Sequence, residues 1–316
     1  MCAAGPSQGE PALSTPDPSR SASLPFSAVP GPAGTRFGLV RRFAEIDSTN
    51  RYVLDEARAG AAEGVVAVAD YQSAGRGRLG RRWEAPPRSN LLVSVLLRPT
   101  VSIEQLHLCT VAVALAAARA CERGAGVIPD LKWPNDLMVG GRKLGGILAE
   151  VVPAGNGPTP AVVVGLGLNV GWPPRDEVGS PVRGAKGGSP SRAETVDIDE
   201  TGTTAPADLD EVLAAATSLG RETGADPDPL VLLGLMLQEL EGRVRDLADR
   251  VGRGRLAGEY RRRCVTVGKT VRVSLPGEEF TGTATDITAE GHLVVDTGAG
   301  LKTVAAGDVV HLREPG

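Results

Sequence analysis

Apolar positions along the chain change their period several times, and each change predicts a different element. A helical pattern begins after a capping residue, Asp47 or Ser48, and a β-branched run over residues 65–69 follows as a buried strand. Residues 91–97 form a second apolar run of strand length, and residues 103–121 form an Ala-rich helix that can pack closely on a sheet. This order predicts a sheet covered by helices.

The next apolar segments predict a hairpin. Residues 137–139 and 143–152 flank Gly140 and Gly141, and two adjacent glycines tolerate the positive φ angles of a two-residue turn. Residues 161–170 supply a further strand with an almost continuous apolar sequence.

Helices and then short strands follow towards the C-terminus. Asp228 and Pro229 are a helix N-cap and first-turn proline, and they predict a helix over residues 230–251 with another helix reaching about residue 263. Short alternating segments separated by glycine turns come after it and predict a small SH3-like domain over residues 264–316. These segments are 270–273, 280–287, 292–296 and 302–304.

Two segments lack periodicity. Residues 1–35 are rich in Pro, Ser, Ala and Gly, carry almost no charge, and are predicted to be a disordered tail without the pattern of a signal peptide. Residues 173–206 are too long for an ordinary connection and are predicted to be a surface insertion. A main domain is therefore expected over residues 36–263.

Composition narrows the class of protein. A chain of 316 residues with 41% hydrophobic residues can bury a full core. The formal charge of −4 argues against a general electrostatic grip on nucleic acid, and no apolar run approaches the roughly 20 residues of a membrane span. Four cysteines far apart and three scattered histidines give no disulfide framework or zinc site, so we expect a cytoplasmic protein.

Residues 75–83, Gly-Arg-Gly-Arg-Leu-Gly-Arg-Arg-Trp, carry the densest chemical signal. Glycines let the backbone wrap tightly and present its amides, and planar guanidinium groups match phosphate oxygens in pairs. We call this segment the Gly-Arg loop and interpret it as a local anion cradle in an acidic protein.

A second basic cluster surrounds the predicted hairpin. Lys132 to Asp136 precede it, and Lys143 opens its second strand shortly before Gly145 and Gly146, which leave room for a ligand against the backbone. Cations in such a place can stabilise charge on a phosphoryl group, and a carboxylate there can hold Mg²⁺ or a nucleophilic amine.

Two further segments offer neutral polar groups. Ser48, Thr49 and Asn50 at a helix start present hydroxyls, an amide and free backbone N–H groups, which suit a neutral polar ligand such as a cyclic urea. Asn169, at the end of a predicted strand, is a candidate for a hydrogen bond to a ribose or phosphate.

Taken together and in this order, these segments resemble the biotin protein ligases over about residues 38–312. The resemblance implies an α+β fold with a mixed sheet flanked by helices, of the class II aminoacyl-tRNA synthetase and biotin ligase type, and a C-terminal SH3-like β-barrel. The segments that carry it are 48–50, 75–83, 132–136, 143–147 and 165–169.

The resemblance also implies an activity. Biotin, as substrate, would react with ATP and Mg²⁺ to give biotinyl-5′-AMP and pyrophosphate. A specific lysine of the biotin carboxyl carrier domain of a biotin-dependent carboxylase would then take the biotinyl group. Both steps need charge neutralisation more than acid–base chemistry.

Roles for individual residues follow from the same resemblance. The residues expected to bind biotin are Ser48, Thr49, Asn50, Gln72, Arg76, Gly77, Arg78 and Lys143. Those expected to bind ATP are Arg78, Arg81, Trp83, Lys132, Asn135 and Asn169. The expected catalytic residues are Lys143, Arg78 and Asp136, of which Asp136 serves either Mg²⁺ or the incoming amine.

Three alternatives stay open from the sequence. A lipoate or octanoyl protein ligase on the same fold would need an apolar tunnel, against which the Gly-Arg loop argues. A biotin-sensing transcriptional regulator would need a basic N-terminal helix-turn-helix, whose place is taken by the nearly uncharged segment 1–35. A non-catalytic carrier-binding module would bind its partner without ATP. We expect a monomer or weak homodimer that binds no nucleic acid and no membrane.

Overall fold

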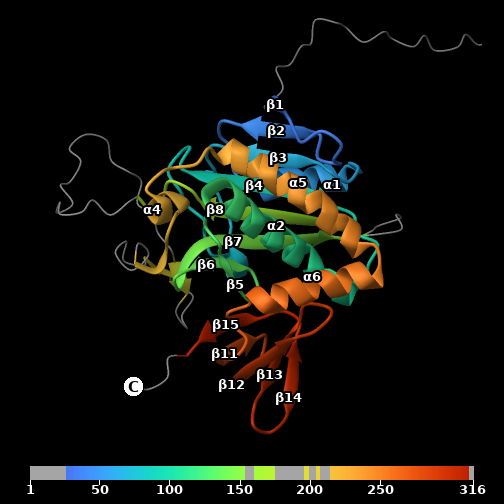
Figure 1. Cartoon of the computed structure of the whole chain (residues 1–316), viewed down its shortest axis with the longest axis vertical. Helices are drawn as coiled ribbons and strands as arrows, with labels where there is room; N and C mark the ends of the chain where they lie inside the picture. The colour runs from blue at the N-terminus through green and yellow to red at the C-terminus, as the bar shows by residue number, and fades with distance from the viewer. Residues whose placement is uncertain (1–25, 154–159, 175–195, 199–203, 207–213, 313–316) are drawn as a thin grey trace, which may run out of the picture.

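The computed structural model describes residues 26–153, 160–174, 196–198, 204–206 and 214–312 (Figure 1). Its main feature is an eight-stranded sheet with the strand order β1-β2-β3-β4-β8-β7-β6-β5. Strands β2 and β3 are parallel, and the other neighbours are antiparallel, so the predicted mixed sheet is confirmed. The strands are β1 (Ser27–Pro30), β2 (Leu39–Phe43), β3 (Val66–Ala69), β4 (Asn90–Leu97), β5 (Asp130–Lys132), β6 (Asp136–Val139), β7 (Arg142–Val152) and β8 (Ala161–Asn169).

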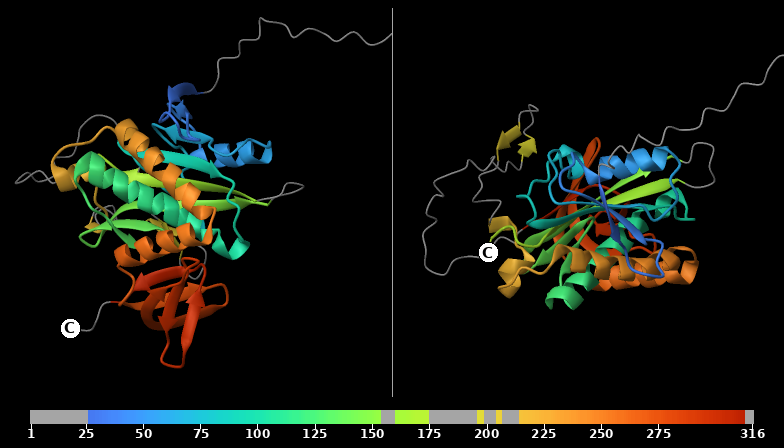
Figure 2. Two further views of the ribbon diagram at one scale, coloured as in Figure 1. Left: turned by 45° about the vertical axis from the view of Figure 1, so that its right-hand side comes forward. Right: turned by 90° about the horizontal axis from the view of Figure 1, so that it is seen from above.

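Helices cover both faces of this sheet, as Figure 2 shows in the view from above. Helix α1 lies on one face, and α2, α5 and α6 lie on the other. The strands serve both layers because successive side chains point to opposite faces: Ala67 packs with α1, whereas Val66 and Val68 belong to the core under α2. The helices are α1 (Thr49–Arg58), α2 (His107–Ala125), α4 (Leu219–Thr223), α5 (Pro229–Leu247) and α6 (Arg250–Arg263), with short 3₁₀ turns at Arg78–Gly80 and Ile103–Gln105.

Helix α2 is the central helix of the larger core. Together with the turn that precedes it, this helix spans Ile103–Ala125. Judged by length and composition alone, it is the one helix among the described residues that could cross a membrane. In the folded protein, 72% of the most apolar stretch of this helix is buried. Its run of alanines allows this, because small side chains let the helix approach the sheet and α5 closely.

The C-terminal strands form a separate five-stranded antiparallel sheet with the order β14-β13-β12-β11-β15, drawn in red in Figure 1. Trp133 joins it to the main domain: its indole N–H donates to the Gly291 carbonyl at 3.0 Å, and its backbone N–H donates to Thr266 Oγ1 at 3.0 Å. The Trp133 side chain is fully buried. The strands are β11 (Thr270–Leu275), β12 (Glu278–Ile287), β13 (Leu293–Asp296), β14 (Leu301–Val304) and β15 (Asp308–His311).

Several sequence-based boundaries need correction. The predicted tail over residues 1–35 is wrong for Ser27–Pro30, which form β1 and pair with β2; residues 1–25 lie outside the described residues. The helix predicted over 230–251 ends at Leu247, because Asp249 caps a new helix, α6, by accepting from the Gly252 N–H.

The predicted insertion at 173–206 lies largely outside the described residues. Within it, β9 (Val196–Ile198) and β10 (Thr204–Pro206) form an antiparallel pair. Strands β2, β5 and β15 were not predicted, because segments of three to five residues are too short to show a period.

Two helical glycines test the packing of α5 and α6. A Cβ on Gly242 would meet no atom within 4 Å, so Gly242→Ala should raise the free energy of unfolding by about 0.5–1 kcal/mol, since alanine loses less backbone entropy than glycine. A Cβ on Gly252 would lie 2.2 Å from the Asp246 carbonyl oxygen, so Gly252→Ala should lower the free energy of unfolding by about 1–3 kcal/mol. Urea unfolding measures both; equal effects would contradict the described junction between α5 and α6.

Candidate active site

One cavity of about 440 Å³ is lined by every residue to which the sequence analysis assigned a catalytic or binding role. Its walls come from the start of α1, the Gly-Arg loop, strands β5 to β8 and the start of β15. Residues far apart in the sequence, such as Arg78 and Lys143, therefore share one hollow. The predicted residues that line it are Ser48, Thr49, Asn50, Gln72, Arg76, Gly77, Arg78, Arg81, Trp83, Lys132, Asn135, Asp136, Lys143 and Asn169.

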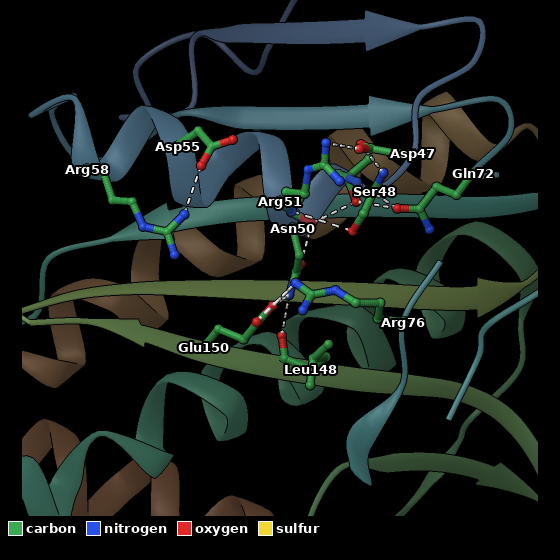
Figure 3. A network of polar contacts seen from close by, with 12 residues as sticks. Asp47, Ser48, Asn50, Arg51, Asp55, Arg58, Gln72, Arg76, Leu148 and Glu150 are labelled. Carbon is green, nitrogen blue, oxygen red and sulfur yellow. Dashed lines mark hydrogen bonds and ion pairs between the residues drawn. The ribbon is translucent and has the colours of Figure 1, made fainter. Parts of the chain in front are cut away.

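Neutral polar groups occupy the end of the cavity next to α1. Ser48 caps the helix by accepting from the Arg51 N–H, and the backbone N–H and the hydroxyl of Thr49 lie 2.7 and 3.0 Å from Gln72 Oε1 (Figure 3). Gln72 reaches this position because the chain after β3 pairs with Ile46 in an isolated bridge. These contacts fix uncharged donors and acceptors before any ligand binds.

Asn50 joins α1 to the sheet. Its Nδ2 donates to the Leu148 carbonyl at 3.1 Å and to Glu150 Oε2 at 2.8 Å, and its Oδ1 lies 2.6 Å from the buried Ser94 hydroxyl. The close approach requires Gly165, because a Cβ there would lie 2.1 Å from Asn50 Oδ1. The amide is therefore held in one orientation from three sides.

The Gly-Arg loop folds back on itself and returns Trp83 to the sheet. Its turn is closed by the Gly77 N–H donating to the Arg81 carbonyl at 2.6 Å, and Leu79 at the turn has a φ of 57°. The Trp83 ring then lies against Gly167, where a Cβ would be 2.4 Å from the ring. The Trp83 indole N–H is buried and has no hydrogen-bond partner among the described residues, so it can donate to a ligand.

Cations gather at the other end of the cavity. Lys143 Nζ lies 2.7 Å from Asp136 Oδ1 and 5.7 Å from the centre of the Trp83 ring. Arg78 donates to Asn135 Oδ1 at 3.1 Å and to the Gly307 carbonyl at 3.0 Å, so both of these contacts are with neutral oxygens. Burial lowers the pKa of Arg78, although an arginine stays protonated at neutral pH. A partly desolvated guanidinium whose direct contacts within the described part of the chain are with neutral oxygens favours an anionic ligand.

Asn169 has a different environment from the one the sequence suggested. Its Nδ2 donates to the carbonyls of Thr217 and Lys143 at 2.9 and 3.3 Å, and its Oδ1 accepts from Asn90 at 3.0 Å. The side chain is 4% exposed, and these contacts hold the Lys143 backbone in place. Its expected contact with a nucleotide stays a prediction.

Some residues at the site were not predicted from the sequence. Ser94 is the one serine in the buried, mostly apolar strand β4, and this isolated polar position is the sequence feature that could have marked it as a site residue. Glu150 is the one charged residue between Leu144 and Val152 of β7, but a lone charged side chain near the end of a long strand is usually solvated and does not by itself indicate a site. Gly307 and Asp308, which contact Arg78 and Arg81, belong to the C-terminal sheet, and no pattern in the sequence indicates where that sheet docks.

Fold and cavity agree with the comparisons to known proteins. Residues 43–169 match the biotin/lipoate A/B protein ligase family, and residues 266–312 match the biotin protein ligase C-terminal domain. The molecule is thus a protein ligase of the biotin/lipoate class.

Individual relatives distinguish the biotin protein ligases from the rest of the biotin/lipoate class. The chain is 37% identical over 287 residues to the biotin–[acetyl-CoA-carboxylase] ligase of Mycobacterium tuberculosis, covering 89% of this chain and 92% of that protein. It is 30% identical to the enzyme of the same name from Paracoccus denitrificans, covering 84% and 98%. It belongs to the biotin protein ligase family.

Solved structures support the fold. The biotin protein ligase from Aquifex aeolicus, in complex with biotin and ATP, superposes with a TM-score of 0.64 at 24% identity and covers 87% of this chain and 99% of that one. The predicted α+β class is confirmed by this likeness together with the five-stranded C-terminal sheet.

The contact between Asn50 and Gly165 gives a test of the site. Gly165→Ala should lower the free energy of unfolding by about 1–3 kcal/mol, because the new methyl group overlaps a side chain that cannot move. In an Asn50→Ala background the same substitution should cost much less, since the overlapping atom is gone. Urea unfolding of both single variants and the double variant measures the coupling, and additive losses would contradict the described contact.

Proposed function

We propose that this protein joins biotin to a biotin carboxyl carrier domain in two steps, through biotinyl-5′-AMP. The observation that carries the proposal is the single cavity, which has fixed neutral polar groups at one end and Arg78 and Lys143 at the other. A ligand with a neutral ring and a carboxylate tail suits such a cavity, with its tail at the cationic end.

The neutral end suits the ureido ring of biotin. This ring offers N–H donors and a carbonyl acceptor, and Ser48, Thr49 and Gln72 supply the opposite groups without a net charge. The predicted roles of Asn50, Arg76 and Gly77 belong to the same end, where they border the ring. A lipoate or octanoyl chain has no groups to satisfy these polar atoms, which favours biotin over that alternative.

The cationic end suits the meeting of a carboxylate with a triphosphate. In the first step a biotin carboxylate oxygen attacks the α-phosphorus of ATP, an acyl–phosphate bond forms, and pyrophosphate leaves. Lys143 and Arg78 reduce the repulsion between the two anions and stabilise the charge on the phosphoryl oxygens. Trp83, Arg81 and Lys132 are the proposed contacts to the rest of the nucleotide, with Asn135 and Asn169 beside them.

In the second step the amine of a carrier lysine attacks the acyl carbon, and AMP leaves with the bonding electrons of the acyl–phosphate bond. Asp136 suits two roles: it can take the proton of the incoming amine, or it can contact the Mg²⁺ of Mg·ATP. No cluster of three or more potential metal ligands occurs in the described part of the chain. In this proposal Mg²⁺ enters as part of the nucleotide substrate, with phosphate oxygens completing its coordination.

The carrier domain of a biotin-dependent carboxylase is the proposed partner, supported by the names of the relatives from Mycobacterium tuberculosis and Paracoccus denitrificans. Cytoplasmic localisation, a monomeric or weakly dimeric state, and the lack of nucleic-acid and membrane binding are kept as proposals.

The activity itself is tested by incubating the protein with biotin, Mg·ATP and a carrier domain. A biotinyl mass increment on one carrier lysine is expected, and it should require ATP. Transfer of lipoate or octanoate instead would favour the alternative ligase, and carrier binding without any transfer would favour a binding module.

Lys143→Ala and Arg78→Ala test the assignment of the cationic end. Each should reduce biotin-dependent pyrophosphate exchange by about 100-fold or more, because each removes a charge from the reacting centre. Lys302→Ala and Arg58→Ala are matched controls, since their cations pair with Glu278 and Asp55 outside the cavity and should leave exchange unchanged. Exchange at the level of the unchanged protein in either site variant would contradict the assignment.

A further inference from the structure

The Glu150 carboxylate contacts both sides of the neutral end of the cavity, although Glu150 is not among the residues that line it. Oε2 accepts from Asn50 Nδ2 at 2.8 Å, and both carboxylate oxygens accept from Arg76 Nη2, at 3.0 and 2.8 Å. Figure 3 shows the three side chains meeting between α1, the Gly-Arg loop and β7. One side chain thus connects two of the residues expected to bind biotin.

The strand register places Glu150 on the cavity side of the sheet. Leu148 pairs with Gly165 and Glu150 pairs with Val163, and paired residues of antiparallel strands point to the same face. That face is the one covered by α1. The carboxylate therefore lies beside Asn50 rather than in the core under α2.

For Asn50, Glu150 completes the set of partners. The two Nδ2 protons go to the Leu148 carbonyl and to Glu150, and only the second of these bonds has a charged acceptor. With Nδ2 held there, Oδ1 must point to Ser94, and the amide cannot turn over. Without Glu150 one N–H of a side chain that is 5% exposed would lose its partner.

For Arg76, Glu150 is the anchor of the Gly-Arg loop on the sheet at this end. The ion pair is half open to water, with side-chain exposures of 46% for Arg76 and 25% for Glu150. An ion pair of this exposure adds little to the stability of the whole protein. Its consequence is local, because it holds the start of the loop over the neutral end of the cavity.

We propose that Glu150 is a positioning residue for biotin, acting through Asn50 and Arg76. The inference rests on the proposed function, since it assigns biotin to the end of the cavity that these two residues border. Removal of the carboxylate affects the binding of biotin. The nucleotide end keeps its own contacts, because Lys143 pairs with Asp136 and the C-terminal domain holds Arg78 and Arg81.

Two substitutions separate the two contacts. Glu150→Gln keeps an oxygen that can accept from Asn50 but removes the charge that holds Arg76, and Glu150→Ala removes both contacts. The matched control is Glu239→Gln, because Glu239 pairs with Arg123 at 3.0 Å with side-chain exposures of 27% and 44%, far from the cavity.

Pyrophosphate exchange is measured with biotin and with ATP as the varied substrate, and thermal unfolding is recorded for each variant. Glu150→Gln should raise the KM for biotin about 10-fold and Glu150→Ala more, with the KM for ATP and kcat within about 2-fold of the unchanged protein. Trypsin should cleave after Arg76 faster in both variants, whereas cleavage after Arg78 and Arg81, which the C-terminal domain holds, should not change. Glu239→Gln should change none of these quantities.

An unchanged KM for biotin in a folded Glu150→Ala variant overturns the proposal. An equal rise in the KM values for biotin and ATP, together with a lower unfolding temperature, also overturns it, because that result indicates a structural role only. In an Arg76→Gln background, Glu150→Gln should add little, and full additivity overturns the route through Arg76. If the unchanged protein makes no biotinyl-5′-AMP, the proposed function fails and takes this inference with it; if it does, only the Glu150 result decides.

Discussion

Two glycines on one face of β8 are the constraint on which the site depends. Gly165 and Gly167 are two residues apart and so point to the same side of the sheet, where Asn50 and Trp83 fill the space that side chains would otherwise occupy. A methyl group at either position would overlap these neighbours. The start of α1 and the end of the Gly-Arg loop can therefore both approach the sheet, and the cavity forms between them.

The charge of the site reflects a local excess of basic side chains in the cavity lining together with their incomplete pairing. The chain has a net charge of −4, yet Arg78 is partly desolvated and contacts neutral oxygens among the residues that the structure describes, while Lys143 pairs with Asp136. An incoming anion can form charge-assisted hydrogen bonds with both cations. Cations already fully paired with carboxylates could not form these bonds without losing their partners. This explains how an acidic protein can present a local site for anions.

The C-terminal sheet takes part in the architecture of the site. The Gly307 carbonyl and the Asp308 carboxylate contact Arg78 and Arg81, so the domain fixes one side of the Gly-Arg loop. Trp133, which lies between β5 and β6, anchors the same domain through two hydrogen bonds. Positioning of the loop and docking of the domain are therefore mechanically connected, and Glu150 holds the same loop at its other end.

By itself the sequence determined the main helices and strands and the hairpin at Gly140-Gly141, because hydrophobic period, capping residues and turn glycines are local signals. The class of fold and most residues of the cavity wall followed from the resemblance of its motifs to the biotin protein ligases. The sequence did not indicate β1 or the partners Ser94, Glu150 and Gly307, and it placed the break between α5 and α6 near residue 251 instead of at Asp249. The three partners depend on contacts between segments distant along the chain: Glu150 meets Arg76 across 74 positions, and Gly307 meets Arg78 across 229. Only the tertiary structure decided them, because strand register and domain docking select which side chains meet, and neither leaves a pattern in the local sequence.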